Sequence, residues 1–134
     1  MSERHRARAL RVVSTPDAPQ PAGHYSQAIV HGDTVYVSGQ LPIDPRTGEK
    51  RTGAIEEQTR QALENVAAIL KAAGSDLRRT VKVTVYISDM SLWPRVNAVY
   101  AEFFGAHRPA RAVVPTRELH FGFQVEIEAV ALCD

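Results

Sequence analysis

Two amphipathic segments constrain the fold of this chain more than any other feature. In residues 55–73, apolar side chains recur at the spacing of a helical face, and Gly74 is well placed to end such a helix. Residues 91–104 repeat the pattern, with Ser91 as the expected N-cap and Pro94 in the first turn, where proline is tolerated. Each helix needs a sheet on which to bury its apolar stripe. The pattern therefore predicts an α+β fold with both helices on one face of a sheet.

The strands of that sheet are visible as β-rich or alternating runs. Residues 81–87 alternate valine and isoleucine with lysine, threonine and tyrosine, which is typical of a half-buried strand. Residues 25–30 and 34–40 flank His31-Gly32-Asp33, which favours a hairpin. The sheet face that the helices leave open must contact water or a partner, and alternating valine and tyrosine there favour a partner. Further strands are expected at residues 8–14, 111–115 and 124–132, and proline-rich loops at residues 14–23 and 41–53.

The length of 134 residues fits a single domain spanning residues 1–134. Within it, residues 1–20 are expected to form a strand and a loop at the amino terminus. Hydrophobic residues make up 44% of the chain and charged residues 23%, which is ordinary globular composition. A domain of this size buries about two thirds of its unfolded surface, so a single core is feasible, and burying a face against a partner subunit would add stability.

The near-neutral charge and the lack of a membrane span or secretion signal in the sequence favour a soluble protein. A net charge of +1 argues against a strong general attraction to nucleic acid, which needs clustered basic residues. The basic cluster Arg4, Arg6, Arg8 and Arg11 is interpreted as a solvated, partly frayed end, with a nucleic-acid contact as the alternative. Cys133 is the only cysteine, so no intrachain disulfide forms. No apolar run approaches the roughly 20 residues of a membrane span, and no secretion signal is evident, so we expect a cytoplasmic protein.

Common catalytic motifs are missing from the sequence. There is no P-loop and no dinucleotide-binding glycine pattern. The five histidines show no paired spacing of the kind that binds zinc, so no metal site is expected. No nucleophile elbow marks a serine hydrolase.

A set of short phrases in a fixed order is the most specific signal in the sequence. They are Tyr25-Ser26-Gln27-Ala28, Val37-Ser38-Gly39-Gln40, residues 42–49, 58–65, 81–90 and 96–100, Phe103-Phe104, Arg108-Pro109-Ala110-Arg111 and residues 125–131. Each phrase is weak alone, but the ordered set is highly specific. Over about residues 20–132 the chain resembles the RidA/YjgF family of reactive-intermediate deaminases.

That resemblance implies both a fold and an activity. The implied fold is chorismate-mutase-like, with a mixed sheet and two helices on one face, assembled as a homotrimer with sites in the clefts between subunits. The implied enzyme is similar to a 2-iminobutanoate/2-iminopropanoate deaminase. It hydrolyses enamine and imine intermediates, such as 2-aminoacrylate and 2-imino acids, to 2-oxoacids and ammonia, and it needs no cofactor.

Arg111 occupies the family's carboxylate-binding position. A substrate with a carboxylate beside an imine needs a fixed cation, and arginine offers a planar fork that stays charged. The alternative is a surface arginine in an ordinary ion pair. We expect Arg111 to bind the carboxylate of a small-molecule substrate.

Glu126 matches the family's acidic residue that positions water. If partial burial raises its pKa, the carboxyl group can relay protons. Glu128 should share the same strand face, because side chains alternate along a strand. The alternative is that both glutamates only line a polar sheet face or pair with arginines.

Three further residues complete the expected site. Tyr25 matches the family's site tyrosine, which would hydrogen-bond the substrate or water; the alternative is a tyrosine that is only packed. The backbone at Ser38 and Gly39 matches the segment lining the pocket, where glycine permits close approach. Asn97 and Tyr100 are assigned to the second helix and its packing, outside the catalytic set.

The chain also departs from the family pattern. The arginine is usually followed by serine or threonine and then cysteine, where this chain has Ala112 and Val113. We therefore expect a more apolar substrate pocket near Val113. His24 and His120 stand at two positions where the family usually has proline, and the sequence leaves open whether either reaches the cleft.

Two other functions remain as alternatives to the deaminase. One is a trimeric ligand-binding or regulatory protein that uses the same clefts without turnover. The other is a ribonuclease or translation inhibitor. The near-neutral charge and the lack of interleaved aromatic and basic residues count against binding of nucleic acid.

Overall fold

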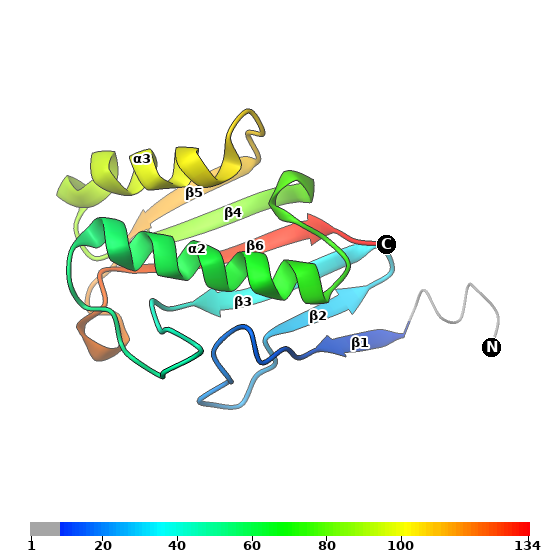
Figure 1. Cartoon of the computed structure of the whole chain (residues 1–134). Coiled ribbons are helices and arrows are strands. Elements are labelled where there is room, and N and C mark those ends of the chain that lie inside the picture. The colour runs from blue at the N-terminus through cyan, green and yellow to red at the C-terminus, as the bar shows by residue number, and fades with distance from the viewer. Residues whose placement is uncertain (1–8) are drawn as a thin grey trace.

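A computed structural model describes residues 9–134 of the chain (Figure 1). Residues 1–8, with Arg4, Arg6 and Arg8 of the basic cluster, lie outside the described residues. The strands are β1 (Leu10–Val13), β2 (Ala28–His31), β3 (Thr34–Gln40), β4 (Thr80–Ile87), β5 (Ala110–Pro115) and β6 (Val125–Leu132). The helices are α2 (Ile55–Ala72) and α3 (Trp93–Phe104), with single 3₁₀ turns at Leu77–Arg79, Met90–Leu92 and His120–Gly122.

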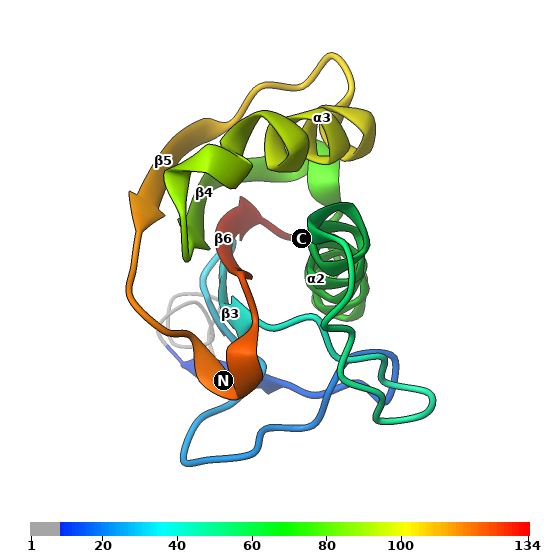
Figure 2. The same ribbon diagram turned by 90° about the vertical axis from the view of Figure 1, so that its left-hand side faces the viewer.

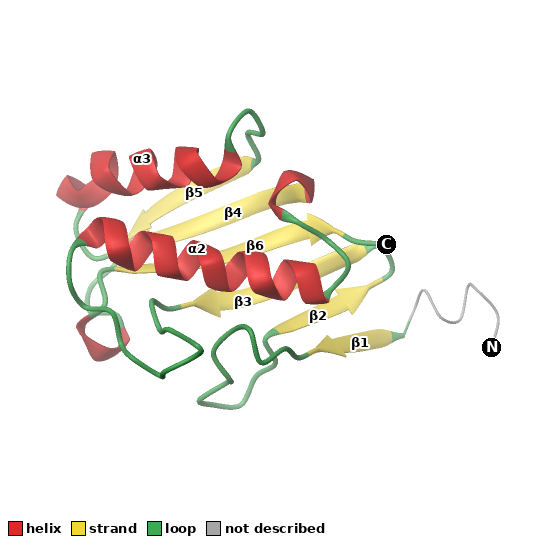
Figure 3. Cartoon of the chain, viewed as in Figure 1, coloured by secondary structure: helices red, strands yellow, loops and turns green. Residues whose placement is uncertain are grey.

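The strands form one sheet in the order β1-β2-β3-β6-β4-β5. Only β4 and β5 pair in parallel, and the other neighbours are antiparallel, so the sheet is mixed. Both helices lie on the same side of it (Figures 2 and 3). The predicted α+β class and the placement of both helices on one face are confirmed. No helix among residues 9–134 is long and apolar enough to cross a membrane.

The core lies between the helices and one face of the sheet. Alternate residues of β6, and of β4 from Val83 onward, are buried, which is what their period-two pattern predicts. Removing this apolar surface from water stabilises the fold by about 25 cal/mol per Å². The deeply buried aliphatic side chains include Val35, Ile55, Leu63, Val66, Ile69, Leu70, Val83, Val85, Ile87, Val96, Val99, Val125 and Ile127.

The hairpin of β2 and β3 forms as predicted, but its first strand is shorter than expected. Pairing begins at Ala28 opposite Val37. Gln27, just before it, is buried, and its side-chain amide is engaged with the preceding loop: the Thr15 N–H donates to Gln27 Oε1 at 2.7 Å and Gln27 Nε2 donates to Pro19 O at 3.0 Å. The segment before Ala28 therefore serves to attach the amino-terminal loop to the sheet.

The sequence prediction is right about the end of α2 and wrong about the cap at the start of α3. Helix α2 ends at Ala72 and Gly74 follows at φ 81°, a conformation that favours glycine, so the predicted stop is confirmed. The assignment of Ser91 as N-cap is wrong. Asp89 instead accepts the Ser91 N–H at 2.8 Å and caps the 3₁₀ turn, and α3 begins only at Trp93, with Pro94 in its first turn.

Candidate active site

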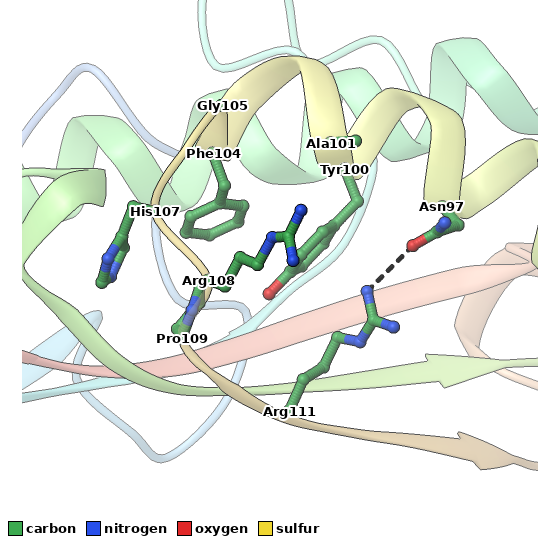
Figure 4. Close-up of a pocket in the computed structure, with 9 residues that line it drawn as sticks. All are labelled: Asn97, Tyr100, Ala101, Phe104, Gly105, His107, Arg108, Pro109 and Arg111. Carbon is green, nitrogen blue, oxygen red and sulfur yellow. Dashed lines mark hydrogen bonds between the residues drawn. The ribbon is translucent and has the colours of Figure 1, made fainter.

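Arg111 lies on β5 and points toward helix α3 (Figure 4). Its Nη1 donates to the side-chain oxygen of Asn97 at 3.0 Å. Its guanidinium carbon lies 4.4 Å from the ring centroid of Trp93 and 4.8 Å from that of Tyr100. Aromatic faces attract a cation while leaving its N–H edges free to donate. We call these four residues the Arg111 half-site.

No ion pair among residues 9–134 neutralises the charge of Arg111. The ion pairs that form there involve other arginines. The guanidinium instead opens onto a pocket of about 460 Å³. The expected alternative of an ordinary ion pair is therefore not what the structure shows. The pocket is lined by Asn97, Tyr100, Ala101, Phe104, Gly105, His107, Arg108, Pro109 and Arg111.

Tyr100 lines this pocket with its ring, and its hydroxyl is buried. The residue is only 6% exposed, and its phenolic oxygen is buried without a hydrogen-bond partner among the described residues. Burial raises the pKa of Tyr100, against the opposing charge of Arg111, so the phenol remains protonated at neutral pH. A buried hydroxyl without a partner costs about 1–3 kcal/mol.

Glu126 lies on β6 between two buried apolar residues and faces the open side of the sheet. Its carboxyl group is half buried, and this burial raises its pKa; the nearby charge of Glu128 raises it further and His120 lowers it. Glu128 itself accepts a hydrogen bond from the Tyr86 hydroxyl at 2.7 Å. A carboxyl group with a raised pKa is suited to exchanging protons near neutral pH.

Gly39 packs directly against Glu126. A Cβ atom added at Gly39 would lie 3.0 Å from Cδ and 3.2 Å from Cγ of Glu126, closer than real Cβ atoms normally come to a neighbour. Glycine at this position therefore lets the carboxyl group approach the β3 backbone. We call Glu126, Gly39, Glu128 and His120 the Glu126 half-site.

Ser38 precedes Gly39 on β3, and Tyr25 lies in the segment before β2. The Ser38 hydroxyl donates to Ser26 O at 2.6 Å, which ties β3 to the segment before β2. Tyr25 is 53% exposed in that segment, and its hydroxyl accepts the Ala22 N–H at 3.4 Å. The ring is thus held locally with much of its surface uncovered, and its predicted contact with substrate stays a prediction.

A single chain does not bring Arg111 and Glu126 together. Arg111 pairs with Val83, whose side chain is buried under the helices, whereas Glu126 pairs with Tyr86 on the open face. Their positions differ by about 10 Å along the strands and by two strand spacings of about 4.8 Å each. They also face opposite sides of the sheet. A site that uses both side chains requires a second copy of the chain.

Three residues that depart from the family pattern, Val113, His120 and His24, lie in different parts of the structure. Val113 shares the helix-covered side with Arg111 and packs against the core, but it does not line the Arg111 pocket. His120 is close enough to act on the pKa of Glu126, so it belongs to that half-site. His24 is exposed in the loop beside Tyr25. The role of Val113 in binding substrate stays a prediction.

Known proteins share both the sequence pattern and the fold of this chain. The family described as endoribonuclease L-PSP matches residues 15–133. The chain belongs to the RidA/YjgF family. A RutC family protein of Pyrococcus horikoshii is 51% identical over 90% of this chain and 95% of its own length. Human 2-iminobutanoate/2-iminopropanoate deaminase, also a RidA/YjgF relative, is 43% identical over 91% and 89%. The structure of Escherichia coli TdcF with bound serine superposes with a TM-score of 0.88 at 37% identity, covering 92% of this chain and 99% of that one.

Within this RidA/YjgF chain, Asn97 and Tyr100 are residues whose contact with Arg111 the sequence prediction missed. They belong to α3 as expected, yet both touch the arginine. A signal was present: Trp93, Asn97 and Tyr100 follow i, i+4, i+7 spacing and share a helical face. A polar asparagine on that mostly apolar face indicates a partner. Across residues 9–134, no cluster of three His, Cys, Asp or Glu side chains could hold a metal ion.

Proposed function

We propose that the protein is a hydrolytic deaminase of 2-imino acids and their enamine tautomers, yielding 2-oxoacids and ammonia. The observation that carries the proposal is the Arg111 guanidinium, which is oriented by Asn97 and two aromatic rings and has no carboxylate partner among residues 9–134. Such a cation is suited to the carboxylate of an imino acid. The name of the human relative and the serine bound to TdcF support a small substrate with a carboxylate.

We further propose that the active unit is a homotrimer whose sites lie between subunits. In each site, the Arg111 half-site of one copy would meet the Glu126 half-site of a neighbour. The separation of Arg111 from Glu126 within one chain supports this arrangement. So does the uncovered face of the sheet, where Tyr36 is 51% exposed and lies one strand from the Glu126 strand.

The reaction assigned to this site is addition of water followed by loss of ammonia. Arg111 holds the carboxylate, and the Glu126 carboxylate accepts a proton from water as the water oxygen bonds to the imine carbon, whose electron pair moves to nitrogen. The proton then passes from Glu126 to the nitrogen, and Glu126 carries the proton of the new hydroxyl group to the same nitrogen, so that ammonia leaves as the carbon–nitrogen bond breaks and the carbonyl forms. An enamine first takes a proton at its β-carbon. Water is consumed and one ammonia is released per substrate, with no change of oxidation state.

Turnover of an imino acid generated in place tests the proposal. An amino-acid oxidase would produce 2-iminobutanoate continuously, and trapping with semicarbazide would report how much remains. We expect the wild-type protein to accelerate its loss. Arg111→Gln should lower kcat/KM by about 100-fold or more, because two charge-assisted hydrogen bonds are removed. Arg78→Gln, an exposed charge change outside the Arg111 pocket, serves as the matched control.

Two outcomes would overturn the deaminase. If wild-type protein left the decay of several imino acids unchanged but bound a 2-oxoacid saturably, the protein would be a ligand-binding member of the family. RNA cleavage that persists through repurification and disappears in Arg111→Gln, without imine turnover, would instead make it a ribonuclease.

A further inference from the structure

The pocket beside Arg111 extends beyond what a small imino acid would fill. It runs along the end of α3 toward the loop before β5, and its volume is about 460 Å³. Figure 4 shows Arg108 reaching from that loop toward Tyr100, while Arg111 reaches from β5 toward Asn97. Two guanidinium groups thus line the same pocket, with the ring of Tyr100 in its wall.

The lining of this pocket is basic without compensation. Among the described residues that line it, two are arginines, one is a histidine and none is acidic. Arg108, like Arg111, is not part of any ion pair formed within residues 9–134. His107 also lines the pocket, but its Nε2 already donates to Thr80 O at 2.7 Å. Two arginines held near each other with no acidic neighbour favour a ligand that carries two negative groups.

We propose that Arg108 is a specificity residue that binds a second carboxylate, so that the preferred substrates are 2-imino dicarboxylic acids. This inference rests on the proposed deaminase and names its substrate class. Arg111 holds the carboxylate next to the imine carbon, and Arg108 holds the one at the far end of the side chain.

The geometry sets a length for the substrate. Arg111 follows Arg108 by three positions, so an extended backbone would separate their Cα atoms by about 10 Å. Both side chains turn into the same pocket, so their charged ends can engage opposite ends of one short molecule. Hydrolysis then gives a 2-oxo dicarboxylate and ammonia, with one water consumed, and leaves the distal carboxylate unchanged.

A comparison of two imino acids tests this assignment. Glutamate oxidase would generate 2-iminoglutarate, and an oxidase acting on 2-aminobutanoate would generate the monocarboxylate 2-iminobutanoate. The measured quantity is the ratio of kcat/KM for the dicarboxylate to that for the monocarboxylate. We expect Arg108→Gln to lower this ratio by about tenfold, as expected for the loss of one hydrogen-bonded charge pair, with little effect on 2-iminobutanoate. Arg108→Lys should recover part of the ratio, and Arg78→Gln should leave it unchanged.

The outcomes separate this inference from the proposed function. If 2-iminobutanoate is hydrolysed but Arg108→Gln leaves the ratio unchanged, or lowers both rates equally, the second carboxylate site is wrong and the deaminase stands. If neither imino acid is hydrolysed by the wild-type protein, the deaminase itself is wrong. Inhibition gives an independent readout: glutarate should compete more strongly than butyrate in the wild type, and Arg108→Gln should remove that difference.

Discussion

Arg111 and Glu126, the two residues central to the proposed reaction, have neighbours that act on their charges in opposite ways. The side-chain amide of Asn97 and the rings of Trp93 and Tyr100 hold Arg111 without neutralising its charge. The surroundings of Glu126 instead disfavour its charged form. Partial burial penalises the carboxylate and the nearby Glu128 repels it, so the pKa of Glu126 rises. In the proposed reaction, the charged Arg111 binds the carboxylate and Glu126 changes its protonation.

Replacing Gly39 tests how closely the chain positions Glu126. In Gly39→Ala, the added methyl would press on Cγ and Cδ of Glu126 and displace its carboxyl group. A misplacement of about 1 Å can reduce a rate by about 100-fold, so kcat should fall by at least about tenfold while the melting temperature changes little. In the control Gly53→Ala, the added Cβ would meet only the flexible end of Glu57, at 3.1 Å. Unchanged kcat in Gly39→Ala would contradict the close approach.

The pH dependence of turnover tests the protonation state of Glu126. Water activation needs the carboxylate, so kcat/KM should rise with pH through the raised pKa of Glu126, with the midpoint above the ordinary value of 4.5. Glu128→Gln removes a negative neighbour and should move this midpoint to lower pH. His120→Asn removes a positive one and should move it to higher pH. A midpoint that stays fixed in both variants would show that another group titrates.

Among the secondary-structure elements, β3 and helix α2 are connected by the loop of residues 41–53. Asp44 is nearly buried within it, with its side chain 4% exposed. It accepts the Arg46 N–H at 2.9 Å and an Arg51 Nη2–H at 2.7 Å, and Arg51 also donates to Gln61 of α2 at 3.0 Å. This network fixes the loop that follows Gly39 against the helix.

Asp44→Asn should destabilise the protein in a pH-dependent way. The Arg46 N–H and then the Arg51 guanidinium lower the pKa of Asp44 to about 2, against 3.8 for an unperturbed aspartate. A lowered pKa in the folded state gives stability that is present above 3.8 and is lost as the pH falls toward about 2. The melting temperature of Asp44→Asn should therefore lie several degrees below wild type at neutral pH. The difference should shrink in acid, whereas Glu64→Gln, an exposed carboxylate on α2, should show no such trend. A constant difference down to the acid range would refute the assigned pKa.

Periodicity in the sequence predicted the elements well but not their neighbours in space. The helix of residues 55–73 and the strand of residues 81–87 were identifiable because each has its own repeat. The cap of α3 was not, because Asp89 and Ser91 are both good caps and the extra 3₁₀ turn decides between them. The order β6-β4-β5 also has no local signature, since it depends on pairing between distant segments. The helical spacing of Asn97 indicates a partner, but only the structure shows that this partner is Arg111. The family phrases predicted Arg111 and Glu126 as site residues, and their roles stay predictions.

At the scale of the whole molecule, the sheet separates the two half-sites. The helices cover one face of the sheet (Figure 2). The strand register places Arg111 on that covered face and Glu126 on the opposite one. A symmetric assembly of identical chains solves this separation, because a closed ring presents one half-site of each copy to the other half-site of the next. In solution, the mass should be about three times the 14.8 kDa of one chain. A monomer that turns over imino acids at full rate would contradict this assembly.

Mixing two inactive variants tests the shared site most directly. Arg111→Gln and Glu126→Gln chains would be co-expressed in equal amounts with different tags, and mixed trimers would be confirmed by native mass spectrometry. Each variant alone should be trimeric and inactive. Random mixing restores one intact Arg111–Glu126 pair at about one quarter of the interfaces, so the mixture should recover about a quarter of wild-type turnover of 2-iminobutanoate. Mixed trimers that stay as inactive as their parents would show that Arg111 and Glu126 do not act together across a subunit interface.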